Sequence, residues 1–266
     1  MSKRSSKRFW ADLTTPEFHG LDPEATIAVL PIAAIEQHGP HLPVSTDTEI
    51  ANGMVRETLQ QLPADLSVLF LPTQAIGKSN EHLRSPGTLT LSAESAIRVW
   101  TEIGESVHRA GLRKLVLVNS HGGNVDVVAI VARELRVRFG MLAVACQWSR
   151  FGSPPGLYTE EEDAVGIHAG DMETSMMLHF RPDLVDMAKA RNFVPSTIEI
   201  ARSFELLRPT GFTAFGWIAQ DLHKDGAAGD ATRATAEKGR LTAEHRALAF
   251  IRLLRDVERF ALPRLA

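Results

Sequence analysis

The sequence has little of several features that would assign it to a specialised class of protein. Its single cysteine, Cys146, cannot form an internal disulfide, so we expect a reducing, cytoplasmic setting. A formal net charge of −3 gives no electrostatic reason to expect nucleic acid or an acidic membrane as a partner. No apolar run approaches the roughly 20 residues that span a bilayer, and no apolar segment of a signal peptide follows the basic start MSKRSSKRFW. We therefore expect a soluble globular protein.

Linker-like segments are missing as well. At 266 residues, 44% of them hydrophobic, the chain can bury a sizeable core. No stretch rich in proline, glycine and serine divides it, so we expect a single domain over residues 21–266. Residues 1–20 form the expected N-terminal arm, in which Phe9, Trp10 and Leu13 can dock on a surface.

Short apolar runs alternate with helical patterns along the chain. Strands are expected at 27–34, 67–72, 113–118 and 141–147, and helices at 47–61, 93–110, 125–139, 171–180 and 230–260. The acidic segment 151–166 is expected to be a loop, and the irregular segment 192–228, with Trp217, is expected to cover something. This alternation predicts an α/β fold, a three-layer α/β/α domain with a mainly parallel sheet.

The stretch from Thr26 to Gly53 carries the first candidate site. Glu36 and His38 follow the first apolar run and, at period 2, project the same way from the strand end. Thr46 and Glu49 have the spacing of a capping box, which places Asp47 in the first turn of the next helix. A carboxylate, an imidazole and a second carboxylate would then meet where a strand leads into a helix, which is typical of a metal site.

Further candidates follow at His121, directly after the third strand, and at Glu173, which begins a short helix after His168. Ligands of open α/β sheets bind outside the carboxyl ends of the strands, so these residues are expected at one edge. The predicted ligand set suits Zn²⁺ or Mn²⁺ and exceeds what one closed tetrahedral zinc needs, so we expect two ions bridged by Asp47. The predicted ligands are Glu36, His38, Asp47, His121 and Glu173.

Simpler interpretations exist for these residues. Asp47 and Glu173 are favoured near helix N-termini whatever their function, and His121 could be a buried structural histidine. The turn Gly122–Gly123 could instead cradle an anion through its backbone N–H groups, with no metal. The metals could also be structural, in a binding or scaffold protein. The lack of cysteine ligands counts against that alternative, because structural zinc sites usually use thiolates.

Four segments of the chain resemble the creatininase family of metal-dependent hydrolases that act on carbon–nitrogen bonds. They are LPIAAIEQHGPHLPVSTD, GKSNEHLRSPGTLTL, VNSHGGN and HAGDMETSMML, and they lie within residues 27–180 in the family's order. The resemblance implies two zinc or manganese ions held at the positions of Glu36, His38, Asp47 and His121. It also implies that His168 lies near the scissile bond and that the protein is a homo-oligomer, often a hexamer.

One departure from the family pattern concerns the substrate. Members that hydrolyse creatinine carry a bulky residue or a carboxylate where this chain has Gly122–Gly123, and Glu173 is the expected replacement ligand. We therefore predict hydrolysis of an amide, formamide or cyclic amide of a small molecule other than creatinine, through a hydroxide activated by two metals. A deformylase or peptidase of cofactor or modified-peptide maturation is the alternative.

Roles within the predicted site follow from this interpretation. His168 is the expected general acid, because an imidazole titrates near neutral pH and can protonate the leaving nitrogen. The expected lining of the substrate pocket is Ser79, Glu81, His82 and Gly122.

Overall fold

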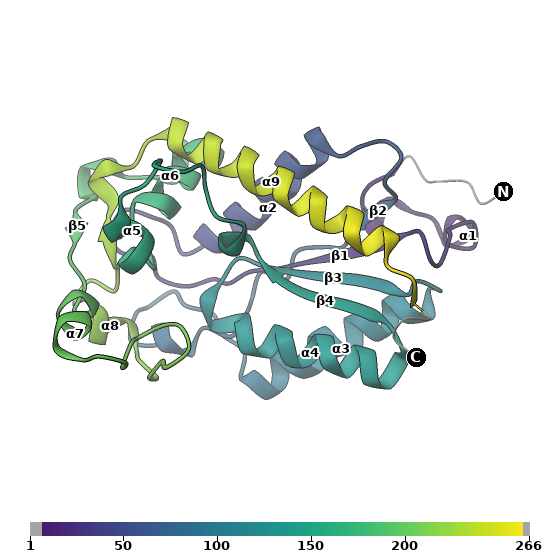
Figure 1. Cartoon of the computed structure of the whole chain (residues 1–266), viewed down its shortest axis with the longest axis horizontal. Helices are drawn as coiled ribbons and strands as arrows, with labels where there is room; N and C mark the ends of the chain where they lie inside the picture. The colour runs from purple at the N-terminus through teal and green to yellow at the C-terminus, as the bar shows by residue number, and fades with distance from the viewer. Residues whose placement is uncertain (1–6, 263–266) are drawn as a thin grey trace.

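A four-stranded parallel sheet runs through the middle of the protein, in the strand order β2–β1–β3–β4 (Figure 1). The computed structural model describes residues 7–262, and the strands of this sheet are β1 (Ile27–Ile32), β2 (Val68–Phe70), β3 (Lys114–Asn119) and β4 (Leu142–Gln147). The prediction of an α/β fold with a mainly parallel sheet is confirmed. Because the chain goes from β1 to β2 on one side and then crosses to β3 on the other, β1 and β3 flank a topological switch point, where such folds bind ligands.

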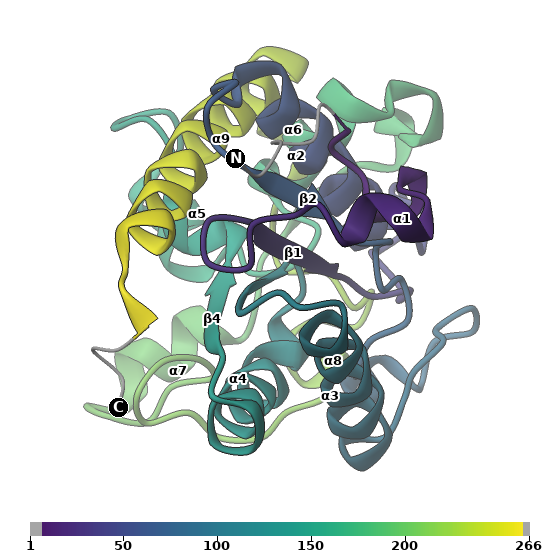
Figure 2. The ribbon, with the colours of Figure 1, turned by 90° about the vertical axis from the view of Figure 1, so that its right-hand side faces the viewer.

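Helices cover both faces of the sheet, which gives the predicted three layers (Figures 1 and 2). On one face, α2 (Thr46–Gln61), α6 (Asp171–Phe180) and α9 (Ala236–Arg259) pack against one another. On the other, α3 (Ala93–Arg109) packs against α4 (Val125–Phe139). Figure 2 shows the strands between these two groups of helices.

The two faces of β1 belong to different hydrophobic cores. Ile27 and Val29 pack into the core beneath α2, α6 and α9, whereas Ala28 and Leu30 pack into the core beneath α3 and α4. A strand buried on both faces has no polar side, which explains why the sequence shows a continuous apolar run here instead of an alternating pattern. The rigid ends of these strands position the site.

The cap of α2 differs from the prediction. Thr46 is the first residue of the helix, and no side chain caps the N-terminus, so the predicted capping box is wrong. The Thr46 hydroxyl donates instead to the carbonyl oxygen of Pro43, at 2.7 Å. Asp47 nevertheless lies in the first turn of α2, as expected.

Two other segments also differ from the prediction. The acidic segment expected as a loop contains α5 (Glu160–Val165), because the Thr159 hydroxyl caps it by accepting the Glu162 N–H at 3.1 Å. The C-terminal helix begins at Ala236 instead of residue 230, because the chain before it forms β6 (Gly229–Asp230) in an antiparallel pair with β5 (Asn192–Phe193).

The remaining short elements lie at the periphery. After β5, the irregular segment 192–228 contains the short helices α7 (Thr197–Ser203) and α8 (Ala219–Leu222), and Trp217 donates its indole N–H to the Pro209 carbonyl oxygen within the same segment. In the expected N-terminal arm, α1 covers Thr15–Phe18, and both Trp10 and Leu13 pack against the core beneath α3 and α4. Residues 1–6 of that arm lie outside the described residues. Within 7–262, no helix has the length and apolar character to cross a membrane.

Candidate metal centre

The five predicted ligands lie together at the carboxyl edge of the sheet. The strand β1 ends at Ile32, two residues earlier than expected, so Glu36 and His38 belong to the loop that leads to α2 and not to the strand itself. Both side chains are buried all the same, with 1% exposure each. The other three are His121 directly after β3, Asp47 in the first turn of α2 and Glu173 in the first turn of α6.

Glu36, Asp47 and His121 form the centre of the cluster. The Nδ1 atom of His121 lies 3.1 Å from Glu36 Oε2 and 3.2 Å from Asp47 Oδ2. The second oxygen of Asp47, Oδ1, lies 3.6 Å from His38 Nε2. The two oxygens of Asp47 therefore face two different histidines, which is the arrangement expected of a carboxylate shared between two cations.

His38 connects this centre with α6. Its Nε2 atom lies 3.8 Å from Glu173 Oε2 and 3.9 Å from Glu36 Oε1. Neither His38 Nε2 nor Asp47 Oδ2 makes a hydrogen bond, although both atoms are buried. A buried polar atom without a partner is costly, so these two atoms indicate that a further group belongs between them.

Backbone carbonyl groups hold the outer nitrogen of three histidines. The distances are 3.1 Å from His38 Nδ1 to the Glu36 oxygen, 3.1 Å from His121 Nε2 to the Lys78 oxygen, and 2.7 Å from His168 Nε2 to the Gln37 oxygen. Because a carbonyl oxygen only accepts hydrogen bonds, each of these nitrogens donates. The other nitrogen of each ring then faces the carboxylates, as a metal-binding histidine requires.

The electrostatics of the cluster follow from this packing. Burial by itself would lower the pKa of His38, but contact with Asp47 raises it to about 9. Burial is likewise outweighed at His121, whose pKa Glu36 and Asp47 raise well above its usual value. His121 in turn lowers the pKa of Glu36, against the effect of burial. The carboxylates thus demand positive charge, which protons on these rings or bound cations can supply.

The side chains fit a divalent cation. Three overlapping sets each offer ligand atoms within 4.8 Å of one another. Buried carboxylates and imidazoles are ligands that Zn²⁺ and Mn²⁺ accept, and the orphaned atoms of His38 and Asp47 lie within these groups. The sets are Glu36–His38–His168, Glu36–Glu81–His121 and His38–Asp47–Glu173.

His168 lies on the opposite side of Glu36 from His121. Its Nδ1 atom is 3.6 Å from Glu36 Oε1, and its backbone pairs with that of Ala228. Burial lowers the pKa of His168, and the charge of His38 lowers it further. A neutral imidazole with one nitrogen anchored and the other facing the cluster can accept a proton there.

The residues predicted to line the substrate pocket have different positions. Ser79 is fully buried and donates a hydrogen bond to Glu36 Oε2. His82 is also buried, with Nε2 3.5 Å from Glu36 Oε1. Only Gly122 is exposed, and a side chain added there would meet no atom within 4 Å. Ser79 and His82 are therefore buried against Glu36, whereas Gly122, next to His121 in sequence, is exposed with room for a side chain.

Glu81 explains why residue 123 has no side chain. Its Oε1 atom lies 3.2 Å from His121 Nε2, on the side of the ring that faces away from Asp47. A Cβ atom on Gly123 would come within 2.2 Å of that oxygen. Glu81 thus occupies the space beside His121 and orients the ring from behind.

Sequence reasoning missed Gln37, which lies between two predicted ligands. Its amide nitrogen is 2.8 Å from His82 Nδ1 and donates to the carbonyl oxygen of Gly226 at 2.7 Å. It therefore ties the loop after β1 to the segment before β6. The alternation of side chains in an extended segment would point Gln37 away from Glu36 and His38. No pattern in the sequence indicates that Gln37 contacts the distant Gly226.

Known proteins similar to this chain share both its sequence and its fold. Residues 11–254 match the creatininase family, described as creatinine amidohydrolase. A mycofactocin precursor peptide peptidase of Mycobacterium ulcerans is 36% identical over 219 residues, which cover 80% of this chain and 78% of that protein. A creatinine amidohydrolase of Pseudomonas putida is 29% identical over 215 residues, covering 73% and 79% of the two chains.

Solved structures agree with this match. The crystal structure of a creatinine amidohydrolase (creatininase) superposes with a TM-score of 0.75 at 24% identity, covering 97% of this chain and all (100%) of the other. Other creatininase structures with the same fold are described as a Zn–Zn type and as a manganese form. Because the family match spans most of the sequence, the chain belongs to the creatininase family.

Proposed function

We propose that this creatininase-family hydrolase cleaves a linear amide or formamide bond, in a small molecule or at the end of a modified peptide. The observation that carries the proposal is the buried cluster in which Asp47 faces both His38 and His121 while two atoms lack a hydrogen bond. Membership of the family makes the chain a metal-dependent hydrolase. The substrate class is the part that we propose.

Two divalent ions, Zn²⁺ or Mn²⁺, are the proposed cofactors. Their side-chain ligands would be Glu36, His38, Asp47, His121 and Glu173, with Asp47 shared between them. When bound, such ions polarise an amide carbonyl group and activate a water molecule. The creatininase structures described as a Zn–Zn type and as a manganese form support this choice of metals.

The chain's own residues would then handle the proton. His168 Nδ1 faces the cluster while the Gln37 carbonyl oxygen holds Nε2, so the imidazole keeps one orientation. In the proposed reaction, His168 accepts a proton at Nδ1 from the attacking water and delivers it to the leaving nitrogen. The lowered pKa of His168 favours the neutral ring that this first transfer requires.

The exposed position of Gly122, next to His121, favours a linear substrate over creatinine. The exposed Gly122 leaves space where a side chain would form a wall. A small rigid ring depends on such walls for its orientation, whereas a larger substrate gains it from contacts remote from the reacting bond. The identity to a protein named as a peptide peptidase, 36%, also exceeds the 29% identity to the creatinine amidohydrolase.

We also propose that the protein is a cytoplasmic homo-oligomer, with a hexamer as one possible form, whose catalytic domain spans residues 21–266. Large apolar side chains gather on the exposed segment between α7 and α8, where Phe204 is 52%, Leu206 68% and Phe212 fully exposed. Contiguous apolar surface of this kind is typical of protein–protein contacts.

The first prediction concerns this assembly. Light scattering of the purified protein should give a mass of at least two 29.2 kDa chains. The double variant Phe212→Ser/Leu206→Ser should have a lower mass. Val137→Ser, at an exposed position on α4, serves as the control for a change of surface polarity. A monomer at all concentrations tested would contradict the proposal.

The second prediction concerns the shared carboxylate. Asp47→Ala should reduce the metal content from up to two ions per chain to one or fewer, because both ions lose a ligand. Elemental analysis of the purified variants measures this. Glu49→Ala is a matched control in the same helical turn, since Glu49 pairs with Arg181 outside the cluster, and it should retain the wild-type metal content. Full occupancy in Asp47→Ala would rule out the bridging role.

The third prediction separates proton transfer from metal binding. His168→Ala should lower kcat by roughly 10²–10⁴-fold, the usual contribution of general acid–base catalysis, while the metal content stays unchanged. The exposed His19 supplies the control, and His19→Ala should leave both quantities unchanged. If His168→Ala loses metal, the residue is a ligand and the catalytic assignment is wrong.

The fourth prediction concerns the substrate. The ratio kcat/KM, measured with Zn²⁺ and with Mn²⁺, should be higher for formamido compounds or short peptides than for creatinine. Gly122→Tyr should selectively lower kcat/KM for the longer substrates, because a Cβ atom at this position meets no atom within 4 Å and the added ring would occupy space that such substrates need. A tenfold preference of the wild type for creatinine would refute the substrate class.

A further inference from the structure

A buried carboxylate outside the metal cluster contacts the backbone of two segments next to the predicted site. Glu162, on α5, is 5% exposed. Its Oε1 atom accepts the N–H of Met172, at 3.2 Å, and its Oε2 atom accepts the N–H of Asp230, at 3.3 Å. One carboxylate thus joins the first turn of α6 to β6, two segments that are far apart in sequence.

Three glycines leave room for this carboxylate. A Cβ atom on Gly166 would lie 2.2 Å from Glu162 Cδ, and one on Gly170 would lie 2.4 Å from Oε1. At Gly229 the corresponding distance to Oε2 is 2.9 Å. Since real Cβ atoms do not approach this closely, the backbone around Glu162 accepts no side chain at these three positions.

The turn that Glu162 contacts has a strained backbone. Ala169 has φ = 56° and is the only non-glycine residue with positive φ among residues 7–262. Its N–H donates to Glu173 Oε2 at 2.6 Å, and the preceding His168 pairs through its backbone with Ala228. A residue with a side chain is strained in this conformation, which persists only where surrounding contacts enforce it.

We infer that Glu162 is a positioning residue, which holds the turn 168–172 so that His168 and Glu173 face the metal cluster. The inference rests on the roles proposed above for these two residues. Glu162 bonds to Met172, the neighbour of Glu173, and to Asp230, which lies two residues after the Ala228 that pairs with His168. It therefore holds the C-terminal end of the strained turn directly, and the His168 end through β6 and the adjoining Ala228.

Other contacts of α6 serve a different purpose. Asp171 pairs with Lys238 at 2.5 Å, which docks α6 on α9, and accepts the hydroxyl of Ser175 within α6 at 3.0 Å. These bonds connect the start of α6 to α9 and not to β6. Among the described residues, Glu162 is the side chain that joins the turn to β6.

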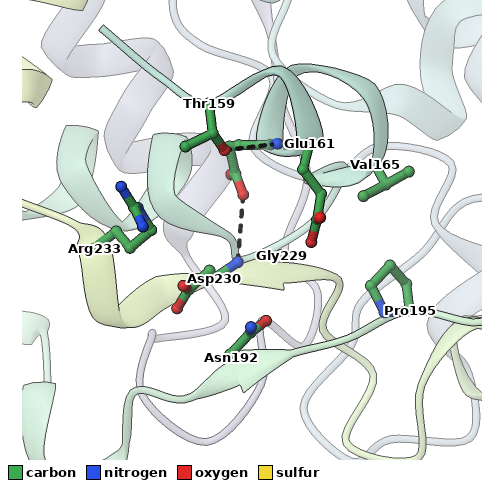
Figure 3. A pocket seen from close by; sticks show the side chains of 9 residues that line it. Thr159, Glu161, Val165, Asn192, Pro195, Gly229, Asp230 and Arg233 are labelled. Carbon is green, nitrogen blue, oxygen red and sulfur yellow. Dashed lines mark hydrogen bonds between the residues drawn. The ribbon is translucent and has the colours of Figure 1, made fainter. Parts of the chain in front are cut away.

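A cavity beside Glu162 provides a way to test this role. It has a volume of about 270 Å³, and its lining includes Glu161, Asn192, Asp230 and Arg233 (Figure 3). Glu162 also lines this cavity, and its carboxylate accepts the backbone N–H of Asp230. Removal of the Glu162 side chain would let a small carboxylate such as acetate enter from solvent and accept the same two N–H groups.

The experiment compares Glu162→Ala, Glu162→Gln and the wild type by two measurements. Zn²⁺ affinity, from competition with a chelator, should fall by roughly 10–100-fold in Glu162→Ala, as is usual when a residue that orients metal ligands is lost. Hydrogen exchange of residues 168–172, measured without metal, should be faster. For Glu162→Gln, both the Zn²⁺ affinity and the exchange rate should lie between those of Glu162→Ala and the wild type, because the amide nitrogen cannot accept the second N–H. Glu161→Gln, on the same helix and cavity, is the control and should match the wild type.

Acetate should partly restore Zn²⁺ affinity and slow the exchange in Glu162→Ala, whereas chloride at equal ionic strength should not, and neither should affect the wild type. If Glu162→Ala does not fold, Glu162→Gln alone must show both the weaker Zn²⁺ binding and the faster hydrogen exchange of residues 168–172. Wild-type affinity and exchange in Glu162→Gln, or a lower melting temperature without faster local exchange, would overturn the inference. If the wild type binds no metal, the proposed function fails, while the exchange measurement still decides the role of Glu162.

Discussion

The mutual burial of two carboxylates at the sheet edge is the constraint on which the rest of the site depends. Glu36 and Asp47 are 1% and 2% exposed, and His121 contacts both within 3.2 Å. Charges of one sign at this depth are unfavourable unless positive charge lies between them. His38 and His121, each held by a backbone carbonyl group, supply this positive charge when protonated, and a bound divalent cation can replace it.

Most of the fold and of the cluster could be predicted because both follow from local patterns. Strands buried on two faces give short apolar runs, and the ends of parallel strands meet at one edge, so Glu36, His38 and His121 were correctly placed together. What could not be predicted depends on contacts distant in sequence. Thr46 has the spacing of a capping box but bonds to Pro43, and α5 lies in an acidic segment that has no helical apolar periodicity.

The glycines near the site also depend on contacts that are distant in sequence. The pair Gly122–Gly123 suggested a single opening in the wall of the site. The structure separates their roles, because Gly122 faces open space while Gly123 yields its place to Glu81. Gly166, Gly170 and Gly229 similarly surround Glu162. Apart from Gly122, each of these glycines lies against a glutamate side chain that single-sequence reasoning cannot identify as its neighbour.

The docking of α6 on α9 has a consequence for how the protein is made. Gly239 lets the two helices approach so closely that a Cβ atom there would lie 2.0 Å from the carbonyl oxygen of Ser175. All the proposed ligands precede residue 174, yet the helix that bears Glu173 is completed by partners at 238 and 239. During synthesis on the ribosome, α6 therefore lacks these partners until the first turns of α9 have emerged, so the position of Glu173 depends on a segment that is made long after the ligands themselves.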